Sequence, residues 1–102
     1  MHYKIIYMDS ALYDMANIKK YLSQFYESSW NKVMSAIEYR VRFLNDMPHS
    51  FPLYPGSAVY RKLVVGNYIV LYRVIEESHI VEVHAIWHGK VNIIEHIENL
   101  PK

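Results

Sequence analysis

The chain has 102 residues, of which 52% are hydrophobic, and eleven Lys and Arg residues against ten Asp and Glu residues give a net charge of +1. This length predicts one domain, residues 1–102, with enough apolar residues for a packed core. The absence of cysteine excludes a disulfide framework, a zinc ribbon and a thiol nucleophile. The N-terminus lacks the features of a signal peptide, and no apolar run approaches the roughly 20 residues that cross a bilayer. We therefore expect a cytoplasmic protein with no membrane partner.

The first half of the chain predicts a strand followed by two helices. Residues 2–8 are rich in β-branched and aromatic side chains, which favours a strand. Asp9-Ser10 and Ser28 or Ser29 are candidate N-caps of two helices, the second of which ends before Pro48. The apolar residues after each cap recur at helical spacing: Ala11, Met15, Ile18, Leu22 and Phe25, then Trp30, Val33, Ile37, Val41 and Leu44. Together they predict a helical hairpin.

The second half predicts a loop and a three-stranded antiparallel meander. The loop covers residues 46–58, and the strands cover 58–65, 68–75 and 79–87. Gly66-Asn67 favours a two-residue hairpin turn. The order β-α-α-β-β-β predicts an α+β domain with the helices on one face of an antiparallel sheet, and a short C-terminal helix can follow the last strand.

The register of the hairpins assigns residues to two faces, because directly opposed residues share a face. The first turn pairs Lys62 with Leu71, and a turn centred on Glu77-Ser78 pairs Arg73 with Glu82 and Leu71 with His84. The face expected under the helices holds Val59, Arg61, Leu63, Val65, Tyr68, Val70, Tyr72, Val74, Val81, Val83, Ala85 and Trp87. The opposite face holds Tyr60, Lys62, Val64, Ile69, Leu71, Arg73, Ile75, Ile80, Glu82, His84, Ile86 and His88, with Lys90 just beyond. Polar groups mixed with exposed apolar residues predict a binding surface there.

These side chains suit the cleavage of RNA through its 2′-hydroxyl, which needs an acid, a base and cations for the growing negative charge. His88 is the candidate acid or base, and Lys62, Lys90 and Arg73 are the candidate cations. The candidate substrate-binding residues are Tyr60, Arg61 and His84.

Simpler roles are open for the same residues. His88 can be a polar residue at a strand end, Arg73 can form a cross-strand ion pair with Glu82, and Arg61 can pack beside Tyr72. We expect no metal and no cofactor, because His84 and His88 on one strand lie roughly 13 Å apart.

Several segments resemble the RelE/ParE superfamily of bacterial toxins from type II toxin–antitoxin modules, the plasmid-stabilisation type. The hairpin from Arg61 to Val74 is similar to the arginine-x-leucine, turn, tyrosine-x-x-x-tyrosine hairpin of that superfamily. The ending Trp87-His88-Gly89-Lys90 is similar to its last strand. Ser10-Ala11, Asp14, Ile18 and Tyr21 resemble its first helix. The resemblance extends from the first strand to about Ile94.

The resemblance implies a toxin that is neutralised by a cognate antitoxin. RelE-like members cleave messenger RNA in the ribosomal A site, and ParE-like members inhibit DNA gyrase. By position, Lys62 matches a basic residue of the RelE-like cleft, Lys90 a catalytic arginine and His88 a histidine of some ribonucleases. The chain departs from the RelE-like pattern at Ile69, where arginine is frequent, and at 91–93, which replaces a basic and tyrosine ending.

The resulting hypothesis is a toxin that inhibits translation by ribosome-dependent cleavage of mRNA, as a metal-independent endoribonuclease (mRNA interferase). The alternatives are a non-enzymatic inhibitor of DNA gyrase and a degenerate toxin that acts only as an interaction partner. The residues expected to bind the antitoxin are Ile69, Leu71, Ile80 and Ile86. A homodimer formed through the same surface is the alternative use of that patch.

Overall fold

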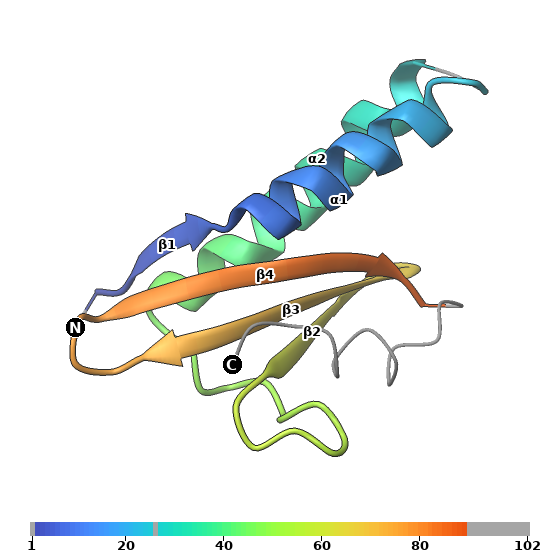
Figure 1. Ribbon diagram of the computed structural model, residues 1–102. Coiled ribbons are helices and arrows are strands. Elements are labelled where there is room, and N and C mark those ends of the chain that lie inside the picture. Colours follow the sequence, from blue (N-terminus) through green and yellow to red (C-terminus); the bar gives the residue numbers. More distant parts are fainter. Residues whose placement is uncertain (1, 26, 90–102) are drawn as a thin grey trace.

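The computed structural model describes residues 2–25 and 27–89, without the side chain of Glu27, and has the α+β order that the sequence predicts (Figure 1). The elements are β1 (Lys4–Tyr7), α1 (Asp9–Leu22), α2 (Glu27–Val41), the 3₁₀ helix η1 (Arg42–Asn45), β2 (Arg61–Val65), β3 (Tyr68–Ile75) and β4 (Ile80–His88). Within these residues, no helix combines the length and the apolar character needed to cross a membrane.

Both predicted helix caps are wrong. Met8 occupies the N-cap position of α1, and Asp9 lies in the first turn, where a negative charge stabilises the positive end of the helix. Ser10 does not cap because its hydroxyl donates a hydrogen bond of 2.6 Å to the carbonyl oxygen of His84. The second helix begins at Glu27, before either predicted serine.

The sheet has the strand order β1-β4-β3-β2. Strands β2, β3 and β4 form the predicted antiparallel meander, whereas β1 pairs with β4 in parallel. The turn at Gly66-Asn67 is confirmed, with Val65 opposite Tyr68 and a positive φ of 58° at Gly66 that favours glycine.

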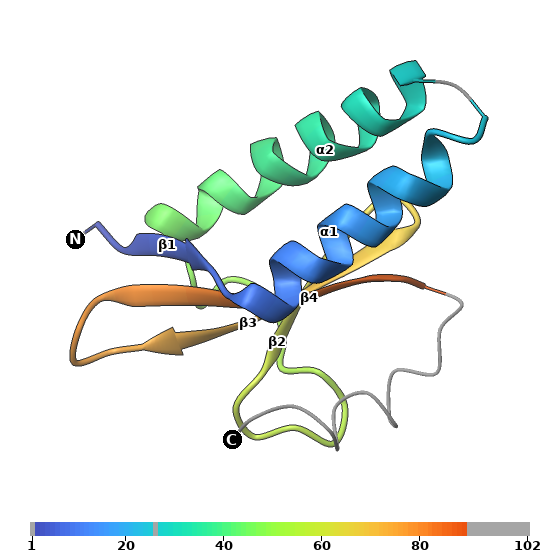
Figure 2. The same ribbon diagram turned by 45° about the horizontal axis from the view of Figure 1, so that its top comes forward.

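The two helices cover one face of the sheet, which we call the helix-covered face (Figures 1 and 2). Residues from α1, α2, η1 and three strands are buried between the layers: Ala11, Met34, Ile37, Val41, Leu44, Leu63, Val65, Val70, Tyr72, Val81, Val83 and Ile86. Ala11, Ile37, Val41 and Leu44 thus confirm the inner part of both predicted stripes. Phe25 does not, because it lies beyond the end of α1 and is largely exposed.

A β-bulge in β4 overturns part of the predicted register. Arg73 lies opposite Glu82 and Tyr72 opposite Val83, as a turn at Glu77-Ser78 requires, but Leu71 then lies opposite Ala85 and not His84. One extra residue in β4 reverses the faces of the residues that follow it. Ala85 and Trp87 therefore lie on the other face, and Ile86 lies in the helix-covered core.

The sheet face opposite the helices, which we call the open face, carries a second apolar cluster. Its buried members are Tyr60, Leu71, Ala85 and Trp87, and Tyr54 and Ile69 pack against them. The chain reaches this face by a tight turn, in which the Tyr54 N–H donates 2.8 Å to the Tyr60 carbonyl and the Ser57 hydroxyl oxygen accepts from the Tyr60 N–H. This turn explains why β2 begins at Arg61 and not at residue 58. Val59, expected in the core, is half exposed on the turn.

Candidate functional site

The open face brings together several of the predicted site residues. Lys62 lies opposite Leu71 on this face, and Arg73 lies two residues further along β3, so that Lys62 and Arg73 are diagonal neighbours. The Arg73 Nε donates a hydrogen bond of 2.7 Å to Oε1 of Glu82. The same carboxylate oxygen lies 3.0 Å from Nε2 of His84. The simpler role considered for Arg73, a cross-strand ion pair, is confirmed.

The electrostatics of this group centre on Glu82. The hydrogen bond from Arg73, followed by that from His84, holds the pKa of the Glu82 carboxyl below its usual range. Glu82 therefore stays ionised near neutral pH and offsets the positive charge of Arg73. Among the described residues, Lys62 also places a positive charge on this part of the open face, and its Nζ lies 5.8 Å from the centre of the Tyr54 ring.

Tyr60 and His84 are buried and not exposed as the sequence predicts. Each is only 4% exposed, and their rings meet edge to face with centroids 5.3 Å apart. Burial raises the pKa of the Tyr60 phenol. Tyr54, from the turn at 54–60, packs against the cluster that contains Tyr60, so a substrate could contact either buried ring only after this part of the structure moved.

Arg61 belongs to the helix-covered face and supports the fold. It lies opposite Tyr72, and its Nη1 donates a hydrogen bond of 2.7 Å to the carbonyl oxygen of Phe51. This is the packing role considered for Arg61 beside Tyr72, and the hydrogen bond occupies part of the guanidinium that a phosphate would need.

His88 is separated from two of the three predicted cations, Lys62 and Arg73. It lies opposite Tyr68, which packs against the helix-covered core, and their rings meet edge to face at 5.4 Å. His88 lies six positions beyond Glu82 along β4, a distance of about 20 Å. His88 lines a cavity of about 380 Å³ at the Gly66-Asn67 turn. Lys90, the remaining cation of the prediction, lies outside the described residues.

The four predicted antitoxin-binding residues differ in exposure. Ile69 and Ile80 are partly exposed, whereas Leu71 is 0% and Ile86 is 2% exposed. The prediction that Leu71 and Ile86 lie on an open surface is therefore wrong. The bulge turns Ile86 into the core, and Tyr60 and Trp87 cover Leu71.

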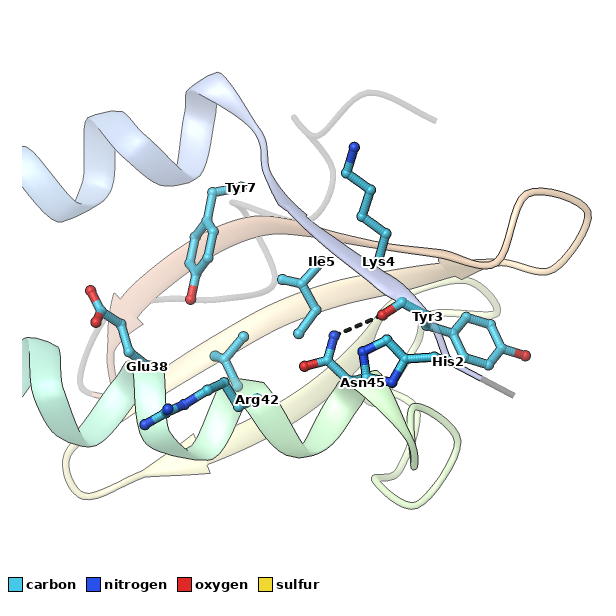
Figure 3. Close-up of a pocket in the computed structure, with 9 residues that line it drawn as sticks. His2, Tyr3, Lys4, Ile5, Tyr7, Glu38, Arg42 and Asn45 are labelled. Atoms are coloured by element: carbon cyan, nitrogen blue, oxygen red, sulfur yellow. Dashed lines mark hydrogen bonds between the residues drawn. The ribbon is translucent and has the colours of Figure 1, made fainter.

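A groove between β1 and α2 was not predicted from the sequence (Figure 3). Its volume is about 640 Å³, and Ile5, Tyr7 and Val41 are among its apolar lining. Asn45 closes one end, because its Nδ2 donates 2.7 Å to the Tyr3 carbonyl oxygen. Burial, followed by the charge of Glu38, raises the pKa of Tyr7. In the described part of the chain, no group of three or more histidine or acidic side chains is arranged to hold a metal ion.

Comparison with known proteins identifies the family. Residues 5–93 match the family described as the ParE toxin of type II toxin–antitoxin systems, parDE. The chain therefore belongs to the ParE toxin family of type II toxin–antitoxin systems. No curated protein matches the sequence significantly.

Solved structures of such toxins share the fold. The chromosomal ParDE system of Pseudomonas aeruginosa aligns with a TM-score of 0.75 and 14% identity, over 87% of this chain and 98% of that one. A free arginine-to-alanine double mutant of the Escherichia coli RelE toxin aligns at 0.72 and 14% identity, over 99% of this chain and 100% of that one. A RelBE toxin–antitoxin complex of Mycobacterium tuberculosis aligns at 0.60 and 20% identity, over 86% of this chain and 99% of that one. Both ParE and RelE toxins thus have the fold of this chain.

Proposed function

We propose that this toxin acts by binding its target without catalysis, that the target is DNA gyrase, and that a cognate antitoxin neutralises it. One observation carries the proposal: His88 lies on the opposite sheet face from Lys62 and Arg73. A general acid or base must reach the same phosphate group as the cations that stabilise its charge. Membership of the ParE family supports gyrase as the target, because the ParE-like members that the sequence resembles inhibit that enzyme.

The proposed role of the open face is correspondingly one of contact. Glu82 offsets the charge of Arg73, and His84 is buried beside Glu82. Such a network orders the strand surface without leaving an accessible acid–base pair. Ile69 and Ile80 remain candidates for antitoxin contact, since both keep part of their side chains accessible.

Ribosome-dependent mRNA cleavage is the second candidate, and one observation favours it. Lys62 and Arg73 are diagonal neighbours on one face, as two cations that hold a single phosphate would be. In that case His84 would supply the imidazole after movement of the turn at 54–60, or His88 would act together with Lys90.

The test is tightly induced expression in a bacterial host with three readouts: growth, plasmid supercoiling with an SOS reporter, and the 5′ ends of messenger RNA. We expect growth arrest, altered supercoiling and an SOS response without new message ends. The double variant His88→Ala with Lys62→Ala should remain toxic, and the purified chain should inhibit supercoiling by gyrase. New 5′ ends within codons that disappear in His88→Ala or His84→Ala would overturn the proposal in favour of the nuclease. An absence of arrest, supercoiling change and cleavage would instead indicate a degenerate toxin.

A further inference from the structure

The outer side of α2 and η1 carries an apolar stripe that the fold does not use. Tyr39, Phe43 and Met47 follow one another at intervals of four residues and are 53%, 40% and 50% exposed. The core-facing residues of the same segment are different: Met34, Ile37, Val41 and Leu44. The segment that runs from α2 through η1 to Met47 thus has two apolar sides, of which only one is buried within the described residues.

The stripe is ordered by contacts among its own residues. The rings of Tyr39 and Phe43 meet edge to face with centroids 5.5 Å apart, and the Arg42 guanidinium lies 5.9 Å from the centre of the Tyr39 ring. Tyr39, Arg42, Phe43, Asp46 and Met47 line a shallow cavity of about 370 Å³. We call these five residues the outer stripe. Aromatic side chains held in this way lose little conformational entropy when they are covered.

The outer stripe carries two opposite charges, Arg42 and Asp46, that can pair between two copies related by a two-fold axis. Arg42 and Asp46 are four residues apart and line the same shallow cavity as Phe43. If two copies pack antiparallel about an axis that passes between Phe43 and Leu44, each Arg42 approaches Asp46 of the second copy, and each Tyr39 approaches Met47 of the second copy. An isologous interface requires this self-complementarity, whereas an interface with an unrelated partner does not require it.

We propose that the outer stripe is a dimerisation surface whose occupant is a second copy of this chain. Arg42 forms no ion pair within the described residues, and Asp46 contacts only His2 in an exposed pair, with 3.0 Å between Nδ1 and Oδ1. Exposed pairs of this kind contribute little to stability, so Asp46 can accept from the second copy at small cost. The outer stripe has five residues, against the roughly 20–30 residues per partner of a standard interface, which predicts a weak, concentration-dependent dimer.

The experiment is sedimentation velocity of the purified full chain over a series of concentrations. We expect reversible dimerisation of the wild type. Arg42→Asp and Asp46→Arg, each of which opposes like charges across the axis, should remain monomeric at the highest concentration. The double variant Arg42→Asp with Asp46→Arg should recover the dimer, because the exchange restores both pairs. Lys20→Asp on the exposed side of α1 changes the net charge as Arg42→Asp does and should leave the dimer intact.

A wild type that stays monomeric at every concentration would overturn the proposal. The same holds if the outer stripe is covered only by the antitoxin in the toxin–antitoxin complex. So would a dimer that ignores both single reversals. Circular dichroism confirms that each variant is folded, and Arg42→Gln and Asp46→Asn, which only remove the charges, should weaken the dimer less than the reversals. The measurement needs no gyrase or ribosome, so its result is independent of the function proposed above.

Discussion

Oδ2 of Asp14 on α1 accepts a hydrogen bond of 3.0 Å from the backbone N–H of Ile86 on β4. This bond lies just past the point where strand pairing stops, because the last backbone bond from the β1 side joins the Met8 N–H to the Val83 carbonyl. From there the hydroxyl of Ser10 donates to the His84 carbonyl and Asp14 accepts from Ile86. Side chains of α1 therefore take the place of a neighbouring strand along the bulged half of β4.

The first prediction concerns this contact. Asp14→Ala leaves the buried Ile86 N–H without its acceptor, which should lower the free energy of unfolding by about 1–3 kcal/mol. Urea denaturation measures the change. Asp9→Ala, an exposed carboxylate in the first turn of the same helix, is the matched control and should cost less than about 1 kcal/mol. Equal losses in the two variants would contradict the role assigned to Asp14.

Local patterns in the sequence were sufficient for the elements and for the first hairpin. The stripes of both helices and the glycine at the turn each depend on a few neighbouring residues, so spacing alone predicts Ile37 and Val41 in the core and Val65 opposite Tyr68. The predicted Ser10 cap of the first helix failed because Ser10 has a long-range partner, the His84 carbonyl, that competes with capping.

The bulge at His84 could not be predicted, since no local residue pattern marks it, and the Ser10 hydroxyl that donates to the bulged residue lies 74 positions away in the sequence. Counting from the turn is correct as far as Val83, and the extra residue then reverses Ala85, Ile86 and Trp87. The packing of the turn at 54–60 against the open face could not be predicted either. Pro55-Gly56 predicts a turn, but the packing of Tyr54 beside Lys62 follows only from the tertiary fold.

The second prediction tests the reversed register directly. Ile86→Ala removes a side chain that is 2% exposed in the helix-covered core, which should cost about 2–5 kcal/mol. Val64→Ala removes apolar atoms from a residue that is 48% exposed and should cost less than about 0.5 kcal/mol. Thermal or urea unfolding of both variants gives the comparison. A small loss for Ile86→Ala would favour the unbulged register.

The third prediction is a pH dependence that arises from Glu82. Because Arg73 and His84 lower its folded pKa below the ordinary 4.5, the folded state binds fewer protons at Glu82 than the unfolded state as the pH falls through this region. The contribution of ionised Glu82 to the free energy of unfolding is therefore present above about pH 4.5 and is lost as the pH falls through the pKa of Glu82 in the folded state. Glu82→Gln should be less stable at pH 7, and its free energy of unfolding should fall less steeply below pH 4.5.

Glu77→Gln, in the exposed turn before β4, is the control for Glu82→Gln and should follow the wild-type curve. Urea titrations at several pH values between neutral and acid measure both variants. If Glu82→Gln and the wild type lose stability in parallel below pH 4.5, the ion pair with Arg73 does not account for the acid sensitivity.

The fourth prediction concerns Tyr72, whose phenol is fully buried and donates a hydrogen bond of 2.7 Å to the Pro48 carbonyl oxygen. Tyr72→Phe leaves that carbonyl without its donor and should cost about 1–2 kcal/mol at neutral pH. Burial raises the pKa of Tyr72 from 10.0 to about 12, so the unfolded state ionises first as the pH rises. The stabilisation is therefore present below pH 10 and is lost between pH 10 and 12, and the difference in stability between wild type and Tyr72→Phe should narrow over that range. Tyr13→Phe, at a phenol that is 69% exposed, should leave the free energy of unfolding unchanged both at neutral pH and between pH 10 and 12. A difference in stability between wild type and Tyr72→Phe that is constant up to pH 12 would show that burial does not raise the pKa of Tyr72 in the folded state.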